Sequence, residues 1–414
     1  MKKLCTALIV GGMCLGLRVQ AQDTLGVWLP PADRVQTLVK NSHGILAAQS
    51  QQAAQLQRAR ATEAGAGEFN LRMSQQNRKT IDPGGRFNEQ LVSLERSVRW
   101  WGKAGLDAKL AEQSRKVASI GYADALHEAS RELMRQWFVL HQLALAREAA
   151  SAQAQLSQEL HRQAQLRLKQ GDISQLDASL AQAELQRAQA AVAVSQAQWT
   201  AAWAQLQKRY PGLPEPAWPA VPSDVPELPA LPTLLQEFLQ NHHELNLRRA
   251  ELQRLRLQAE RMDRDRLPDP VLGVYAARER AGAESIVGVS LGFALPGSAR
   301  QAHAAAALAE ANQLEEQVQQ MTLDLGAAFE ARWLNLHLQR QALTSLQLAA
   351  QTQATAVTQS LKAFAMGEHS MTELIQNRRL AQESLRERQR LQLELVESWA
   401  LMNLDLHRIW DFDE

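Results

Sequence analysis

The sequence has few cysteines and almost no excess of charge of either sign. Its 414 residues include two cysteines, Cys5 and Cys14, and both lie in one apolar stretch near the N-terminus. If that stretch is removed, the chain has no thiol for disulfides, thiolate metal sites or nucleophilic catalysis. The formal net charge is only +1, and charges of one sign do not form long runs. Nucleic-acid binding, which depends on clustered Lys and Arg, is therefore not expected.

Long apolar runs are also missing. The strongest one, residues 4–17, follows Lys2 and Lys3 and is succeeded by Ala21, a small residue suited to cleavage. This pattern predicts a secretory signal peptide over residues 1–21. No later segment reaches the run of about eighteen apolar residues that a membrane helix needs, so a helical membrane span is not expected.

Aromatic residues make up 5% of the chain, whereas Ala, Gln, Leu, Arg and Glu are abundant. This composition is typical of long helices and coiled coils rather than of a compact enzyme. No proline occurs from Gly102 to Gly171 or from Gly297 to Gly367, and apolar residues recur there at helical intervals. Each stretch therefore predicts one amphipathic helix of about 100 Å, which reverses at its second glycine and returns.

Five landmarks recur along the chain at a constant offset of 196 residues. The pairs are Trp137 and Trp333, His141 and His337, Gly171 and Gly367, Asp177 and Glu373, and Trp203 and Trp399. A constant offset predicts a duplicated unit, with repeat 1 over residues 22–210 and repeat 2 over residues 233–414. The linker between them, residues 211–232, holds eight of the fourteen prolines and is expected to run extended.

Each repeat is expected to begin with a helix, over residues 33–66 or 233–266, followed by two strands. In the last of these strands Val287, Val289 and Leu291 alternate with small residues. Such alternation is typical of a sheet whose two faces meet different surroundings. The four strands are expected at about residues 68–76, 87–101, 270–278 and 285–295.

Four strands cannot close a barrel, and an open sheet edge in lipid would leave backbone groups unpaired. If the strands enter a membrane, several chains must combine them, and three chains would supply twelve strands, an even number within the range of outer-membrane barrels. Trp100 and Trp101 lie where strand gives way to helix, a position at which Trp commonly marks the membrane interface. The alternative is that these Trp residues cover a soluble core.

No catalytic, cofactor-binding or metal-binding constellation is recognisable. The sequence has no phosphate-binding loop, no paired-cysteine motif and no Gly-x-Ser-x-Gly turn. His242 and His243 are adjacent in a predicted helix, where side chains about 100° apart are poor partners for one ion. His141 and His337 each follow a Trp by four residues, which favours a role in helix packing. A non-enzymatic protein without a cofactor is therefore expected.

The two reversal segments, Arg167–Ala178 and Phe364–Leu374, share a pattern. Each contains a glycine, a serine three positions later and an acid six positions later. In these segments, and in the order of helix, strand pair, long hairpin and Pro-rich linker over the whole mature chain, the sequence resembles the TolC-type outer-membrane efflux family. The resemblance implies a mostly α fold with a small β part: a trimeric, twelve-stranded outer-membrane β-barrel continued by a periplasmic α-helical barrel. The junction over residues 296–300 resembles that of the cobalt-zinc-cadmium resistance branch.

The resemblance implies a passive conduit in a tripartite efflux system. The expected partners are further copies of the chain in a homotrimer, a periplasmic adaptor (membrane fusion) protein, an inner-membrane pump of the resistance-nodulation-division type and outer-membrane lipid. Heavy-metal cations are the expected cargo. The alternatives are a duct for drugs or type I secretion, and a soluble periplasmic coiled-coil adaptor or scaffold. Gly12-Met13 before Cys14 fits poorly the small-residue box of lipid-anchored members, so acylation is not expected.

The resemblance also implies two sites. Glu373 matches the first of two acids at the periplasmic aperture, the second place holds Gln376, and His369 lies nearby in sequence. Three copies of Glu373 around an axis would concentrate cations by focusing the field. The alternative is that Glu373, like Asp177, only stabilises the start of its helix. The residues expected at the adaptor-contacting tips are Lys169, Gly171, Asp172, Ser174, Met366, Gly367, Glu368 and Ser370.

Overall fold

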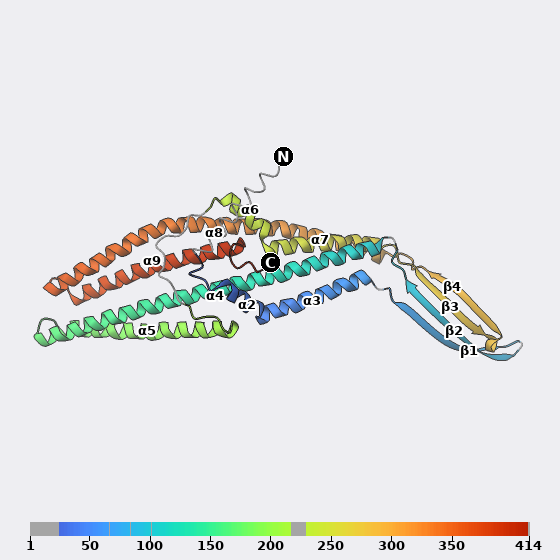
Figure 1. Ribbon diagram of the computed structural model, residues 1–414, viewed down its shortest axis with the longest axis horizontal. Coiled ribbons are helices and arrows are strands. Elements are labelled where there is room, and N and C mark those ends of the chain that lie inside the picture. The colour runs from blue at the N-terminus through green and yellow to red at the C-terminus, as the bar shows by residue number, and fades with distance from the viewer. Residues whose placement is uncertain (1–24, 66, 83, 101, 217–228, 413–414) are drawn as a thin grey trace. The chain divides into compact units, whose positions relative to one another are not determined.

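The computed structural model of the chain describes residues 25–65, 67–82, 84–100, 102–216 and 229–412 (Figure 1). The expected signal peptide, Trp101 and most of the Pro-rich linker lie outside the described residues. The chain forms two compact units, each assembled from separate segments. Unit 1 comprises Met1–Leu46, Ala125–His242 and Asp324–Glu414, and unit 2 comprises Ala47–Asp124 and His243–Leu323.

The order helix, helix, strand, strand, long helix, long helix occurs twice. The first series is α2 (Ala32–Lys40), α3 (His43–Ala64), β1 (Phe69–Thr80), β2 (Gly85–Ser97), α4 (Lys103–Gln170) and α5 (Gln175–Arg209). The second is α6 (Leu231–Asn241), α7 (His243–Arg264), β3 (Val271–Glu279), β4 (Glu284–Gly292), α8 (Ser298–Met366) and α9 (Met371–Asp405), with the short 3₁₀ helix η1 (Arg280–Gly282) between β3 and β4. The fold is therefore mostly α with one small sheet, as the sequence predicts.

The helices expected over residues 33–66 and 233–266 are each interrupted. α2 ends where the backbone N–H of Asn41 donates back to the carbonyl of Thr37, and α3 begins two residues later. α6 ends at His242, whose ψ of 115° lies outside the helical region, and α7 begins at the next residue. The prediction that His242 and His243 lie within one helix is therefore wrong.

The strands of unit 2 form one antiparallel sheet in the order β1-β2-β3-β4 (Figure 1). Leu71 of β1 pairs with Leu94 of β2, which pairs with Val274 of β3, which in turn pairs with Val289 of β4. Residues in register on neighbouring strands point to the same face, so these four side chains form one row across the sheet. Rows above and below repeat this arrangement every two residues.

The strands extend differently from their expected bounds. β1 continues to Thr80, past the expected end near residue 76, because its polar residues keep pairing with β2 as far as Gly85. β2 ends at Ser97 rather than at residue 101. Beyond Ser97 the neighbouring chain is Pro270, which has no N–H to donate, and only its carbonyl accepts a bond from Val98 N, at 2.9 Å.

Two long helices dominate each half of the sequence. α4 has 68 residues and α8 has 69, as the proline-free stretches predict. Each is followed after a short turn by a return helix of 35 residues, α5 or α9. No helix in the described residues is long and apolar enough to cross a bilayer.

Corresponding Trp residues of the two halves make corresponding contacts in unit 1. Trp137 of α4 donates from Nε1 to the carbonyl of Trp28 at 2.8 Å, and Trp333 of α8 donates to the carbonyl of Pro229 at 3.1 Å. The histidine four residues after each Trp stacks on an indole, with ring centroids 5.1 Å and 5.6 Å apart. These residues therefore pack the helices against the segments that precede α2 and α6.

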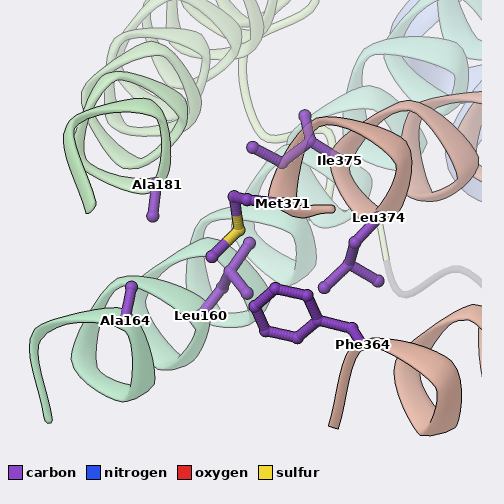
Figure 2. Packing of buried hydrophobic residues seen from close by; sticks show 7 residues of the cluster. All are labelled: Leu160, Ala164, Ala181, Phe364, Met371, Leu374 and Ile375. Carbon is purple, nitrogen blue, oxygen red and sulfur yellow. The ribbon is translucent and has the colours of Figure 1, made fainter. Parts of the chain in front are cut away.

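Close to the two turns, the hairpin α4–α5 packs against the hairpin α8–α9 (Figure 2). The buried cluster there consists of Leu160, Ala164, Ala181, Phe364, Met371, Leu374 and Ile375. Figure 2 shows Met371 lying between Ala181 and Leu160, so that its flexible side chain fills the space between the small residues of the first hairpin.

Candidate functional site

One face of the sheet, here called the apolar face, carries apolar side chains in the open. Its members are Phe69, Leu71, Met73, Val92, Leu94, Leu272, Val274, Val287, Val289 and Leu291. All of them are exposed, Val289 by 83% of its surface. Soluble monomers rarely expose apolar patches of this extent, because each buried square ångström of apolar surface is stabilising.

The opposite face, here called the polar face, is the more buried of the two. Glu89 is only 2% exposed, accepts a hydrogen bond from Gln76 at 2.8 Å and pairs with Arg78 at 3.1 Å. Arg78 also pairs with Glu279 at 3.4 Å. One apolar row, Leu91, Ala277 and Ile286, crosses this otherwise polar surface. The sheet is thus inverted relative to that of a soluble protein, since its apolar face is the more exposed and its polar face the less exposed of the two.

The apolar face continues past the strands at the end where the helices join. Trp100 follows β2 and is 53% exposed, and Leu295 follows β4 and is 90% exposed. From Val92 to Trp100 the apolar positions span about 26 Å along the strand, close to the height of the apolar band of outer-membrane barrels. Trp100 therefore lies at the end of the apolar face nearest the helices, while Trp101 lies outside the described residues.

Arg96 interrupts the apolar face, and the structure gives the reason. Its guanidinium carbon lies 4.9 Å from the ring centroid of Phe69, the residue directly opposite it on β1. A guanidinium over an aromatic ring is attracted to the π face, and its aliphatic stem covers apolar surface. The charge is thus accommodated within the row.

A buried ionic network, here called the junction network, joins the sheet to the helices within unit 2. Lys103, at the start of α4, is fully buried. Its Nζ lies 3.0 Å from Asp265 Oδ1 and 2.8 Å from Asp269 Oδ1, and donates to the carbonyl of Leu267 at 2.7 Å. A lone buried ammonium would cost several kcal/mol, so these three partners are what make its burial possible.

A third carboxylate of the junction network, Asp107, binds two arginines. Arg99 Nη1 lies 2.9 Å from it and Arg261 Nε 2.6 Å from it. Arg99 also donates to the last carbonyls of α3, at Glu63 and Ala64, with distances of 3.0 Å and 2.8 Å. The segments that enter and leave the sheet are therefore tied to one another by charge-assisted hydrogen bonds.

Both hairpin turns have the same backbone construction. Gly171 and Gly367 adopt φ of +83° and +78°, a region that glycine enters without strain. Each turn has the paired 6→1 and 5→2 bonds of a Schellman motif; Asp172 N donates to Arg167 O at 2.9 Å, and Glu368 N donates to Ala363 O at 2.9 Å. The shared sequence pattern thus encodes a helix stop and an immediate restart.

The serine and the acid of each pattern form a capping box. Ser370 Oγ accepts from Glu373 N at 3.2 Å, while Ser370 N donates to Glu373 Oε2 at 2.8 Å. Ser174 and Asp177 make the same exchange at the start of α5. These bonds satisfy backbone N–H groups that the first helical turn leaves open. Glu373 therefore caps its helix whatever else it does.

The three aperture candidates, Glu373, Gln376 and His369, differ in charge and in exposure. The hydrogen bonds from the backbone and side chain of Ser370 hold the pKa of Glu373 below its ordinary value of 4.5, so its carboxylate stays charged in mild acid. Gln376 is exposed on the same helix. His369 is half-buried, and its Nδ1 lies 3.2 Å from Ser360 Oγ within the second hairpin.

The expected tip residues are all exposed. They are Lys169, Gly171, Asp172 and Ser174 on the first turn, and Met366, Gly367, Glu368 and Ser370 on the second. Each turn also presents an apolar side chain, Met366 or Leu176, both 68% exposed. The two tips thus offer mixed polar and apolar surface.

Sequence reasoning gave no role to Arg167, which joins the two hairpins. Its Nη1 donates to Phe364 O at 3.1 Å and its Nη2 to Ala365 O at 2.9 Å, and its guanidinium lies 5.0 Å from the ring centroid of Phe364. Farther along the same hairpins, Arg379 of α9 forms an ion pair with Glu184 of α5. Neither contact has a local sequence signal, because each joins residues almost 200 positions apart.

Two histidines of unit 1 lie against each other beside a buried carboxylate. His127 and His407 stack with centroids 5.3 Å apart, and His127 Nε2 lies 3.6 Å from Asp405 Oδ1. Asp405 also pairs with Arg131 at 3.3 Å and Arg332 at 2.6 Å. Burial favours its neutral form, but these cationic and hydrogen-bonding neighbours outweigh burial and lower its pKa. The carboxylate is thus engaged by arginines.

Comparisons with known proteins find similarity in structure but not in sequence. No family model matches the chain, and no curated protein matches it in sequence. Solved structures do match. The outer-membrane channel OprN has a TM-score of 0.76 at 15% identity, with 92% of this chain and 90% of that chain covered.

Two further solved structures, from Vibrio cholerae and Campylobacter jejuni, are also similar. The outer-membrane protein VceC of Vibrio cholerae has a TM-score of 0.73 at 14% identity, with 92% of this chain and 98% of that chain covered. The outer-membrane channel CmeC of Campylobacter jejuni has a TM-score of 0.70 at 13% identity, with 92% and 85% covered. The chain therefore has the fold of the TolC-type outer-membrane efflux channels.

Proposed function

We propose that the chain is the outer-membrane channel of a tripartite efflux system. It acts as a passive conduit, while an inner-membrane pump of the resistance-nodulation-division type supplies the energy and a periplasmic adaptor connects the two. The sheet lies in the outer membrane and the long helices extend into the periplasm. The similarity in fold to outer-membrane channels supports this function.

The inverted sheet is the observation that carries the proposal. An exposed apolar face opposite a polar face is unfavourable in water but suits a wall with lipid outside and water inside. Leu71 and Val289, exposed in the middle of the sheet, would bury their side chains in hydrocarbon. Glu89 and Arg78 of the polar face would line an aqueous lumen.

The open edges of the sheet support a homotrimer. β1 and β4 are the outer strands, and each leaves one row of backbone groups without a strand partner among the described residues. Such groups must be paired inside a bilayer, so β4 of one copy is proposed to join β1 of the next. Three copies then give a closed barrel of about twelve strands with a water-filled lumen.

The two hairpin tips are proposed as the periplasmic entrance. Exposed residues there, such as Asp172 and Glu368, would contact the adaptor. Glu373 is proposed to serve both as a helix cap and as one member of a threefold ring of carboxylates that favours cations. The proposed cargo is heavy-metal cations, on the strength of the sequence resemblance to that branch.

Deletion of the gene followed by growth on cobalt, zinc, cadmium, copper, silver and common antibiotics tests the function and the cargo together. Sensitivity to the metals alone is the expected result. Sensitivity to antibiotics alone would replace the metal cargo by drugs, and unchanged growth on every compound would contradict an efflux role. The adaptor contact is tested separately by charge reversal at Asp172 and Glu368, where unchanged transport and unchanged cross-linking to the adaptor would refute it.

A further inference from the structure

The apolar face ends in basic residues on the side away from the helices. Lys79 of β1 and Arg86 of β2 are directly opposite each other across the strand pair, and both are exposed. Arg278 of β3 lies on the same face, in the row next to the last apolar row, and is exposed as well. These three residues, here called the basic rim, lie beside the turns that connect the strands.

The two faces of the sheet differ in where their acids lie. The strands contain four acids, Glu89, Glu95, Glu279 and Glu284, and the register puts all four on the polar face. No acid lies on the apolar face of the described strands. Among the described residues no ion pair involves a member of the basic rim, whereas the polar-face Arg78 pairs with two glutamates.

Like charges directly opposite each other on neighbouring strands destabilise a sheet. Lys79 and Arg86 form such a pair at the exposed end of the first hairpin. A bound anion between them would convert repulsion into two charge-assisted hydrogen bonds. The pair lies on the same face as the apolar band, six residues or about 20 Å past its last row at Met73 and Val92, so an anion attached to an apolar body could reach both.

The same face has room for that apolar body. A shallow hollow of 540 Å³ lies on the sheet, lined by apolar side chains that include Phe69, Leu94, Val274 and Leu291. Val274 is four residues from Arg278 on β3, or about 13 Å along the strand. This distance is within half the thickness of a bilayer's hydrocarbon core, about 15 Å. A headgroup beside Arg278 can therefore place an acyl chain over the hollow, whereas Lys79 and Arg86 lie about 26 Å from the row of Val274 and can contact only the polar part of such a lipid.

We propose that the basic rim binds the phosphate groups of an anionic lipid, with an acyl chain over the apolar face. The inference rests on the proposed insertion of the sheet into a membrane. Basic residues next to a membrane bind anionic headgroups mainly by electrostatic attraction. The occupant is a phosphorylated glycolipid of the leaflet that borders the strand turns, and its role is to neutralise the charge pair.

The experiment measures binding of a fluorescent, diphosphorylated glycolipid (lipid A) to the full-length mature chain in neutral detergent, with its dephosphorylated form and inorganic phosphate as competitors. The test variant carries Lys79→Gln and Arg86→Gln. The matched control carries Arg72→Gln, which removes an exposed β1 cation from the polar face. Binding is expected to weaken about fivefold for each charge removed from the rim and to stay unchanged in the control.

A second variant, Lys79→Glu, places an acid opposite Arg86 and supplies the missing counter-charge within the protein. It is expected to lose glycolipid binding while the sheet melts at the same or a higher temperature. Equal binding of the phosphorylated and dephosphorylated lipids, equal loss in the Arg72→Gln control, or full competition by inorganic phosphate would each overturn the inference.

Flotation with vesicles of pure phosphatidylcholine separates this inference from the proposed function. Insertion into these neutral vesicles requires only the apolar face. A chain that fails to insert contradicts the channel itself. A chain that inserts but shows no dependence on lipid phosphate contradicts only the basic rim.

Discussion

Arg167 of α4 donates two hydrogen bonds to the last carbonyls of α8, to Phe364 O at 3.1 Å and to Ala365 O at 2.9 Å. The arginine thereby caps the C-terminus of a helix in the other hairpin, where a positive charge is favoured by the helix dipole. At the offset of 196 residues, the corresponding position in the second repeat is Ala363. This cap therefore has no counterpart in the opposite direction, although both hairpins derive from the same repeat.

Replacement of Arg167 by Gln is expected to loosen the end of α8. Two charge-assisted bonds to a partly exposed group are worth about 1.4 kcal/mol after screening, so amide hydrogen exchange at residues 363–367 is expected to accelerate about tenfold. Arg162→Gln is the matched control, because Arg162 pairs only with Glu159 on its own helix among the described residues. Equal exchange rates in both variants would show that Arg167 does not hold the hairpins together.

The double role proposed for Glu373 can be separated with Glu373→Gln. Glutamine retains the capping box, so α9 is expected to keep its start while the charge disappears. In planar bilayers the ratio of cation to anion permeability is expected to fall on the order of twofold, a modest change because the second acid place holds Gln376. Asp177→Asn, at the corresponding cap of α5, is expected to leave the ratio unchanged.

The pH dependence of this selectivity follows from the lowered pKa of Glu373. A lowered pKa keeps the carboxylate ionised at and above its ordinary value of 4.5, so the selectivity is expected to be constant from pH 7 to about 4.5. It is lost as the pH falls further, through the lowered pKa. A loss of selectivity already near pH 6 would assign the charge to another group, and an unchanged ratio in Glu373→Gln would leave Glu373 as a cap alone.

Opposite faces of β1 are expected to respond differently to one added charge. Leu71 lies on the apolar face and its neighbour Asn70 on the polar face, and both are exposed. Leu71→Lys is expected to destabilise the folded barrel in lipid by about 2–4 kcal/mol, whereas Asn70→Lys faces the lumen and is expected to change it little. The measurement is urea unfolding of vesicle-reconstituted protein. A soluble scaffold would tolerate both substitutions equally.

The buried ammonium of Lys103 makes the junction network sensitive to a single substitution. Lys103→Met leaves the carboxylates of Asp265 and Asp269 without their shared cation and is expected to cost about 3 kcal/mol in guanidinium unfolding. Lys109→Met, at an exposed position of the same helix, is expected to cost less than about 0.5 kcal/mol. Similar losses in both variants would mean that the network contributes no more than surface charge does.

The same network makes the stability of the fold depend on pH. Burial raises the pKa of Asp265, but hydrogen bonds and charge from Arg261 and Lys103 outweigh burial and lower it. Its contribution is therefore present above the ordinary value of 3.8 and is lost as the pH falls through the lowered pKa. The wild type is expected to lose stability below about pH 4 more steeply than Lys103→Met, in which this carboxylate has lost one of its cations.

The sequence predicts the parts of the fold that repeat locally. The alternation around Val289 predicts β4, and the glycine–serine–acid patterns predict both turns, because strand and cap geometry depend on residues a few positions apart. The break after α2 also had a signal, since Asn41-Ser42 favours a turn. The break at His242 had a weaker signal, because Asn241 favours a turn but no serine, glycine or proline accompanies it.

Contacts between distant residues were beyond sequence reasoning. Arg96 interrupts the apolar alternation of β2, and only the register, which puts Phe69 opposite it, shows how its charge is accommodated. Lys103 gave no sign of burial, because its three partners are more than 160 positions away. Charges are placed by the tertiary fold, and a single sequence without its register cannot show which of them are paired.

The most direct test of the channel proposal is a disulfide between β1 and β4. These strands are at opposite edges of the sheet, so they cannot meet within one chain but must meet between copies in a closed barrel. With residues 1–21 removed the chain has no cysteine, so Leu71→Cys combined in turn with Val287→Cys, Val289→Cys or Leu291→Cys introduces one pair at a time. In lipid vesicles with oxidant, at least one pair is expected to give a covalent trimer, with each single variant giving at most dimers. Monomers from all three pairs, together with the mass of one chain in detergent, would contradict the trimeric channel.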